Sequence, residues 1–182
     1  EVFIYARQND LIFPRTTAIL DQLNLTVLDA RIITSTQDYV VHSYHVLEQS
    51  GERLTDPMRQ VQISVRLREA LSGQDQADLQ VQRREARQIR HFTVPTQITF
   101  RDEPQRQGTV MELIATDRPG LLSKVGRAFS QCDVRLNNAR ISTIGSRAED
   151  IFLLTGKDNL PLTDDQVRLK LKASIVELVG ES

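Results

Sequence analysis

Several residue types that mark particular protein classes are scarce in this sequence of 182 residues. Its single cysteine, Cys132, excludes a disulfide within the chain and fits a small core residue of a cytoplasmic protein. Tryptophan is absent and aromatic residues make up only 5% of the chain, too few for the stacked aromatics of an RNA-binding sheet. The net charge of -1 would not gather nucleic acid or acidic lipid, and no apolar run reaches the roughly 18 residues of a membrane-spanning helix. We therefore expect a soluble protein without nucleic-acid or membrane partners.

The sequence does contain an internal repeat. Residues 4–34 align without a gap to residues 113–143, at a constant offset of 109 positions. Six of these 31 positions are identical, including the run Ala-Arg-Ile at 30–32 and 139–141. The apolar pattern matches along the rest of the segment and resumes after a one-residue slip. The repeat predicts two copies of one structural unit.

Each copy shows the same order of expected elements. A short strand is followed by a loop and a helix, then by two strands that form a hairpin, and then by a second helix. A Thr55-Asp56-Pro57 cap begins the second helix of the first copy, and a capping box of Thr163 with Gln166 begins that of the second copy. The expected strands are 2–6, 25–34 and 39–48 in the first copy and 110–115, 134–143 and 148–155 in the second.

The order of elements predicts an α+β fold of two ferredoxin-like units, βαββαβ, with antiparallel sheets and helices on one face. We expect the first domain to comprise residues 1–72 plus a strand at 94–101. Residues 73–93 then form an exposed linker or insertion, and the second domain comprises residues 108–182, with no residues left for a last strand of its own. The chain begins inside an expected strand and without Met, which suggests a piece of a longer protein.

The most pointed local feature is the loop Asp117-Arg118-Pro119-Gly120 between a strand and a helix of the second copy. Gly120 lets the backbone come close to a ligand, and the amides of the first helical turn can donate to a carboxylate. Asp117 can cap that helix or accept a hydrogen bond from an ammonium group. The alternative interpretation is that Asp117 only caps the helix and that Pro119 and Gly120 only turn the chain.

Residues 117–143 strongly resemble an ACT domain, a paired module that binds amino acids. Nearly the whole chain resembles the C-terminal tandem ACT region of the bifunctional uridylyltransferases/uridylyl-removing enzymes of bacterial nitrogen control. The most specific matches are residues 90–92 with Val94, and residues 139–145 ahead of Glu149-Asp150. The resemblance implies a fold of two ACT units and a regulatory role for this chain.

In that family, glutamine binding to the ACT pair shifts the balance between adding and removing uridylyl groups on the PII signal protein. By resemblance the catalytic domains, with their Mg, lie outside this chain, so we expect no catalytic residues and no cofactor here. The implied partners are glutamine, the catalytic domains of the same protein, PII through the full enzyme, and further copies of the chain in a homo-oligomer. The alternatives are an oligomerising ACT module without ligand sensing, and a stand-alone ACT regulator that binds another amino acid.

The resemblance also assigns candidate ligand-binding residues. The second copy keeps the family's loop pattern, which makes it the main candidate site, whereas the first copy lacks both the Asp and the Pro of that loop. This departure puts a second site of equal affinity in doubt. The candidate residues are Asp117, Arg118, Pro119, Gly120, Leu121 and Leu122 in the second copy and Asn9, Asp10 and Leu11 in the first.

Other polar groups fit specific chemistry less well. The three histidines, at 42, 45 and 91, show no metal-ligand spacing, so we predict no metal site. Glu149 and Asp150 alternate across a strand and cannot act as a general acid and base pair. Arg31 and Arg140 are expected on the sheet face away from the helices, where they either order the contact between units or only solubilise it. The basic residues at 83, 84, 87, 90 and 91 are interpreted as a solvated linker face.

Overall fold

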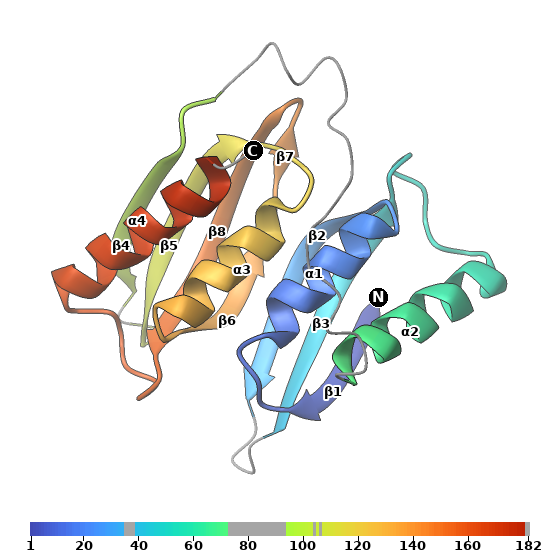
Figure 1. Ribbon diagram of the computed structural model, residues 1–182, viewed down its shortest axis with the longest axis horizontal. Coiled ribbons are helices and arrows are strands. Elements are labelled where there is room, and N and C mark those ends of the chain that lie inside the picture. The colour runs from blue at the N-terminus through green and yellow to red at the C-terminus, as the bar shows by residue number, and fades with distance from the viewer. Residues whose placement is uncertain (35–38, 73–93, 104, 106, 181–182) are drawn as a thin grey trace.

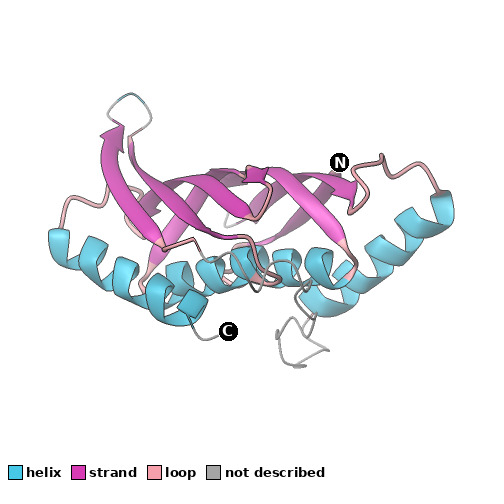
Figure 2. Cartoon of the chain, turned by 90° about the horizontal axis from the view of Figure 1, so that it is seen from above, coloured by secondary structure: helices cyan, strands magenta, loops and turns pink. Residues whose placement is uncertain are grey.

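The computed structural model describes residues 1–34, 39–72, 94–103, 105 and 107–180. Within these ranges, eight strands form one antiparallel sheet and four helices cover one of its faces (Figures 1 and 2). The predicted α+β class is therefore confirmed. The elements are β1 (Val2–Arg7), α1 (Ile12–Gln22), β2 (Leu25–Thr34), β3 (Tyr39–Glu48), α2 (Pro57–Leu71), β4 (Gln97–Glu103), β5 (Gly108–Thr116), α3 (Leu121–Gln131), β6 (Val134–Arg140), β7 (Thr143–Ile144), β8 (Arg147–Gly156) and α4 (Asp165–Gly180).

The two units lie side by side in this sheet, whose strand order is β1-β3-β2-β6-β8-β5-β4, with β7 paired to β8. They join where β2 pairs with β6, and α1 packs against α3 on the helical face. Ala30 of β2 lies opposite Ala139 of β6. These two residues are equivalent in the internal repeat, so a pseudo-two-fold axis passes between them and relates the two units.

The repeat extends to local irregularities of the backbone. Both long hairpins carry a register shift at matching places, between Val27 and Asp29 in β2 and between Leu136 and Asn138 in β6. The helices before these strands both end in a left-handed residue, at Asn24 with φ 58° and at Asp133 with φ 57°. Such residues satisfy the last carbonyls of a helix and turn the chain sharply. The polar residues at both helix ends therefore have a defined conformational role.

The strand expected at residues 94–101 does not complete the first unit. It forms β4, which pairs along its whole length with β5 of the second unit, from Gln97 opposite Ile114 to Glu103 opposite Gly108. Only residues 104–107 separate β4 from β5 in the chain, and so short a connection strongly favours a hairpin. The assignment of this strand to the first domain was wrong. The second unit obtains its fourth sheet position from the strand that precedes it, while β1 pairs only with β3 among the described strands.

The helix caps agree with the sequence in one unit and differ in the other. Asp56 caps α2 by accepting a hydrogen bond from the Met58 amide at 2.9 Å. For α4, the Asp164 carboxylate accepts from the Gln166 amide at 2.8 Å, so this turn uses the residue after the expected Thr163. None of the helices in the described ranges is long and apolar enough to cross a membrane. The segment 73–93, interpreted as a linker, lies outside the described residues.

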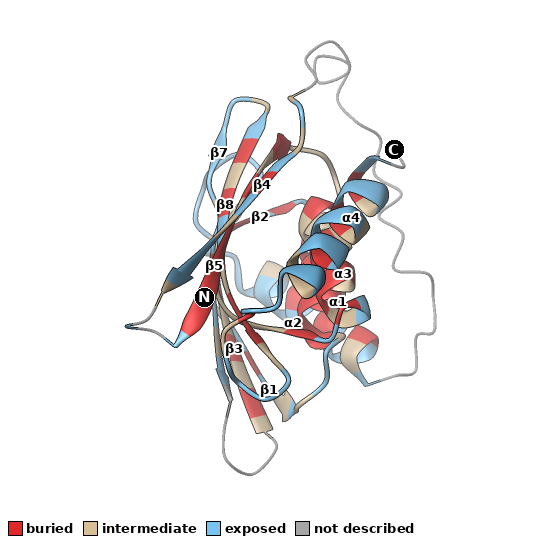
Figure 3. Ribbon diagram, turned by 90° about the vertical axis from the view of Figure 1, so that its left-hand side faces the viewer, coloured by how far each residue is buried: buried red, intermediate tan, exposed pale blue. Residues whose placement is uncertain are grey.

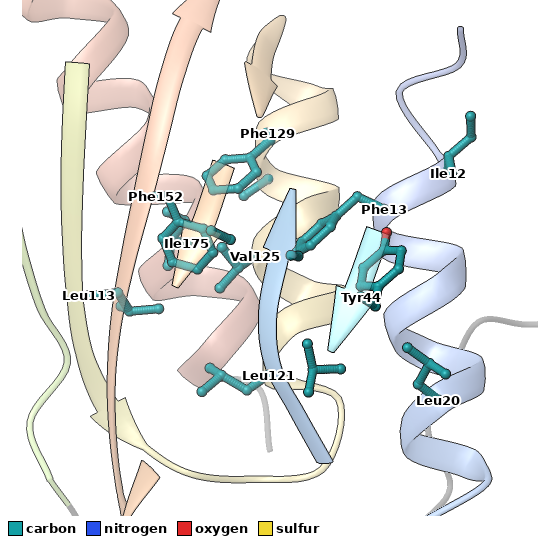
Figure 4. Close-up of a cluster of buried hydrophobic side chains, with 14 of the residues drawn as sticks. Ile12, Phe13, Leu20, Tyr44, Leu113, Leu121, Val125, Phe129, Phe152 and Ile175 are labelled. Carbon is teal, nitrogen blue, oxygen red and sulfur yellow. The ribbon is translucent and has the colours of Figure 1, made fainter. Parts of the chain in front are cut away.

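A single apolar core lies between the sheet and the helices and continues from one unit into the other (Figures 3 and 4). Tyr44 of β3 and Phe152 of β8 are both fully buried, as their matching places in the repeat predict. Phe129 of α3 meets Phe152 edge to face, with 5.4 Å between ring centroids. Cys132 is buried at the end of α3, which confirms its interpretation as a core residue.

Candidate ligand-binding site

A cavity of about 270 Å³, here called the junction pocket, lies where the two units meet. The second unit contributes the loop between β5 and α3, the first turn of α3, and parts of β7 and β8. The first unit contributes the C-terminal half of α1 and the beginning of β2. The lining residues are Thr17, Asp21, Leu25, Thr26, Val27 and Gln49 from the first unit, and Asp117, Arg118, Pro119, Gly120, Leu121, Leu122, Ser123, Ile141, Thr143, Ala148 and Asp150 from the second.

All six candidate residues of the second copy, 117–122, line this pocket. The loop is held at both ends by backbone hydrogen bonds: the Asp117 amide donates to the Ser146 carbonyl at 2.9 Å, and the Lys124 amide donates to the Gly120 carbonyl at 2.9 Å. Since the first unit forms the opposite wall, neither unit alone makes the cavity. A ligand bound here would contact both units at once.

Gly120 adopts a left-handed conformation, with φ 81°, and is the N-cap residue of α3, which has no side-chain cap hydrogen bond. The Gly120 amide donates to the carboxylate of Asp21, near the end of α1 in the other unit. The loop of one unit is thus tied to a helix of its neighbour, directly at the pocket.

Asp150 is the functional candidate that sequence reasoning missed. It points from β8 into the buried layer and is only 1% exposed. Its Oδ1 accepts a hydrogen bond from the Ser142 amide at 3.2 Å, while Oδ2 is buried and has no hydrogen-bond partner in the described part of the chain. Burial, with a smaller contribution from the nearby Asp117 charge, raises the pKa of Asp150 to about 7.

The pseudo-two-fold axis generates a second location, here called the mate pocket, which measures only about 50 Å³. Asn9 and Asp10 line it, and together with Leu11 they also line an open surface hollow of about 820 Å³ beside it. Asn9 accepts a hydrogen bond from the Leu11 amide at 2.8 Å, and Asp10 lies 4.0 Å from Lys157. The candidate residues of the first copy therefore lie between a small pocket and an open surface hollow, and not in a cavity shared in the same way as the junction pocket.

The ring of Phe13 lines the mate pocket. Phe13 reaches from α1 toward α3 (Figure 4) and packs on Gly126, whose missing side chain makes room for it. In the junction pocket the equivalent residues are Leu122 and Thr17. Leu122 is smaller than Phe13, and Thr17 is larger than Gly126. The mate pocket thus carries the bulkier ring of Phe13 where the junction pocket has Leu122, in keeping with its smaller volume.

We expect Gly126→Ala to destabilise the protein by about 1–3 kcal/mol, the range for an overpacked core. A Cβ at this position would lie 2.7 Å from Cδ1 of Phe13, so the ring must move. The double variant Phe13→Leu with Gly126→Ala should recover most of the loss, because the smaller side chain leaves room for the methyl group. Urea unfolding of both variants measures this, and a Gly126→Ala protein as stable as the parent would contradict the packing argument.

The buried polar residue also differs between the pockets. His42 occupies the position in the first unit that Asp150 occupies in the second, and it lines the mate pocket. Its Nδ1 lies 3.0 Å from the Tyr44 hydroxyl, and burial lowers its pKa to about 4. His45 on the opposite face of the strand is exposed and contacts Glu1. Both histidines therefore have explained environments.

The remaining candidates divide between described and undescribed residues. Among the residues that the structure describes, no three His, Cys, Asp or Glu side chains are arranged so that they could hold a metal ion. Arg31 and Arg140 lie in the strand pair that joins the units, opposite Asn138 and Asp29, and both are exposed. Their proposed ordering of the junction stays a prediction. The basic cluster at 83–91, including the third histidine, lies outside the described residues.

Comparison with known proteins places this geometry in context. No protein-family model matches the sequence. A bifunctional uridylyltransferase/uridylyl-removing enzyme from Methylococcus capsulatus is 54% identical over 181 residues, which is 100% of this chain and 21% of that enzyme. The chain is homologous to one segment of these bifunctional enzymes. Uridylyltransferases/uridylyl-removing enzymes from Pseudomonas putida and Pseudomonas fluorescens are 43% and 42% identical, over 97% and 100% of the chain and 20% of each enzyme.

The chain thus spans about one fifth of the length of the curated uridylyltransferase/uridylyl-removing relatives that it matches. These identities extend over both units and over the segment between them. The sequence-based resemblance to this enzyme family is therefore confirmed.

Proposed function

We propose that this chain is the tandem ACT regulatory region of a bifunctional uridylyltransferase/uridylyl-removing enzyme, and that glutamine binds in its junction pocket. The parent enzyme would carry the two catalytic activities and act on the PII signal protein, as the family resemblance implies. The observation that carries the proposal is a cavity built jointly by both units and lined by the whole of the loop from Asp117 to Leu122.

The size and polarity of the junction pocket support a small polar ligand. Its volume of about 270 Å³ lies just below the roughly 300–1,000 Å³ typical of sites for drug-sized molecules. Its carboxyl groups, Asp21, Asp117 and Asp150, suit an ammonium or amide nitrogen, and Arg118 suits a carboxylate. Gln49 and Thr143 offer neutral hydrogen-bonding groups. An uncharged amino acid such as glutamine matches this mixture.

The position of the pocket suggests how binding could reach a catalytic domain. A ligand that contacts both units favours the relative arrangement of the units to which it binds more tightly. It shifts the equilibrium between two arrangements only by the difference in its affinity for them. The contact between Asp21 and the Gly120 amide crosses the same boundary. Glutamine would therefore act by changing how firmly, or at what angle, the two units are joined.

We expect glutamine to raise the thermal stability of this chain, and other common amino acids to do so less. A ligand that binds only the folded state stabilises it by about 2.7 kcal/mol at 100 times its dissociation constant. Asp117→Asn should reduce the glutamine effect, whereas the control Asp10→Asn changes the corresponding loop of the first unit and should leave it intact. Differential scanning fluorimetry with each amino acid measures this.

The pattern of stabilisation also separates the alternative functions. Stabilisation by a different amino acid would favour an ACT regulator of another pathway. No stabilisation by any amino acid at millimolar concentration, together with loss of oligomers in a Gly120→Val variant, would favour an assembly module and contradict the glutamine proposal. The oligomeric state would be followed by light scattering under the same conditions.

A further inference from the structure

We infer that Asp150 contacts the ligand of the junction pocket: its Oδ2 atom accepts a hydrogen bond from a nitrogen of the bound amino acid. This inference rests on the proposed amino-acid binding and deepens it, because it names the protein atom that recognises the ligand. It also makes Asp150 a determinant of which amino acids bind.

The geometry around Asp150 leaves one strong acceptor unused. The residue is 1% exposed and lies in the wall of the cavity. The Ser142 amide, 3.2 Å from Oδ1, fixes the orientation of the carboxyl group. Oδ2 is buried and has no partner among residues that the structure describes. Buried carboxylate oxygens are almost always hydrogen-bonded. Oδ2 is therefore suited to accept a hydrogen bond from a donor group of a bound ligand.

The charges around the cavity decide which donor fits. Three carboxyl groups, of Asp21, Asp117 and Asp150, and one guanidinium, of Arg118, line it. Such a surface attracts a nitrogen that carries hydrogens and repels an additional carboxylate. Glutamine brings an α-ammonium and a side-chain amide, whereas glutamate replaces the amide with a negative group. The pocket should therefore prefer glutamine to glutamate.

The mate pocket has different polar residues at the three equivalent positions, and its one carboxyl, of Asp10, comes from another position of the repeat. The repeat places Ser130, Gln8 and His42 where the junction pocket has Asp21, Asp117 and Asp150. None of these positions carries a carboxyl group, and His42 already pairs with the Tyr44 hydroxyl. The unused acceptor therefore belongs to the junction pocket alone, which is also the larger of the two.

The test compares Asp150→Asn with the control Glu149→Gln, in which an exposed carboxyl on the opposite face of the same strand becomes an amide. Binding of glutamine is measured by titration calorimetry, together with two analogues that each lack one nitrogen: glutaramic acid without the α-amine, and norvaline without the amide. We expect Asp150→Asn to weaken glutamine binding about tenfold or more, and Glu149→Gln to change it less than twofold. The loss in Asp150→Asn should vanish for the analogue that lacks the contacting nitrogen.

The pH dependence gives a second readout on the unaltered protein. Because the ionised carboxyl is the acceptor and burial raises its pKa to about 7, glutamine should bind up to about tenfold more tightly at pH 8 than at pH 6. Asp117, Asp21 and Arg118 face the same cavity and remain in the Asp150→Asn variant. A pH dependence that disappears in this variant is therefore due to Asp150.

Two results would overturn the inference, and they are distinguishable. If the parent chain binds glutamine but Asp150→Asn binds equally well, or if binding by the parent chain does not change between pH 6 and pH 8, Asp150 does not contact the ligand and only this inference fails. If the parent chain binds neither glutamine nor either analogue, the proposed function fails as well. Thermal melts of the variant show whether its fold is retained.

Discussion

Replacing Asp150 with Asn should leave the stability nearly unchanged at pH 4 and raise it by about 3–4 kcal/mol at pH 8. Burial raises the pKa of this carboxyl from 3.8 to about 7, so between these pH values the folded protein keeps a proton that the unfolded chain releases. The contribution of Asp150 to the free energy of unfolding is therefore most favourable below pH 4, and it is lost as the pH rises through 7. Asparagine stays neutral and has no such loss.

The measurement is the free energy of unfolding in urea, taken at intervals from pH 4 to pH 8. His42 has the opposite effect, because burial lowers its pKa from 6.5 to about 4 and stability then falls as the pH drops from 6.5 to 4. The two slopes largely offset each other in the parent chain. Asp150→Asn should therefore expose a slope that rises with pH, while Glu149→Gln should not. Parallel curves for parent and Asp150→Asn would show that Asp150 is not strongly shifted.

Replacing Phe152 with Ala should destabilise the entire chain by about 3–5 kcal/mol, the range for removing a buried Phe. Phe152 is fully buried in the second unit and stacks edge to face on Phe129. The core is continuous across both units, so this loss should not stay within the second unit. We expect both units to unfold in one transition at a lower denaturant concentration.

Tyrosine fluorescence can report on this coupling because the three tyrosines, at 5, 39 and 44, all lie in the first unit, and the chain has no tryptophan. Circular dichroism reports on both units together. Coincident curves from the two probes, both shifted by Phe152→Ala, would confirm a shared core. A tyrosine transition that stays in place would mean that the first unit unfolds independently. The exposed Phe3 provides the control, since Phe3→Ala should change stability by less than about 0.5 kcal/mol.

The internal repeat allowed much of this fold to be predicted. Its constant offset identified two equivalent units, and Arg31 and Arg140, expected on the sheet face away from the helices, are both exposed. The fourth strand was misassigned because a repeat suggests that both copies are completed in the same manner. The pairing of β4 with β5 is decided by the short connection at 104–107, which outweighs the analogy between units.

The candidate site was predicted only in part, since six of its seventeen lining residues come from the other unit. The loop at 117–122 is recognisable from its residues, but Asp21 shows no signal in sequence that connects it to Gly120, 99 positions away. Glu149 and Asp150 were correctly separated onto two faces of a strand. The sequence reasoning considered only that these two residues cannot act as an acid and base pair. Asp150, whose side chain points inward, matters because it lines a cavity that forms only where the two units meet.

The facing of Ala30 with Ala139 shows that the units meet as two copies in a symmetric dimer would. In a true dimer every substitution appears twice, so enlarging one side chain would close both cavities. A covalently joined pair is free of that constraint, and here the pocket lined by Phe13 measures only about 50 Å³ while the pocket lined by Leu122 measures about 270 Å³. If glutamine binds in the junction pocket alone, its binding should follow a simple hyperbola, so any steep response to glutamine would have to arise from contacts between whole molecules.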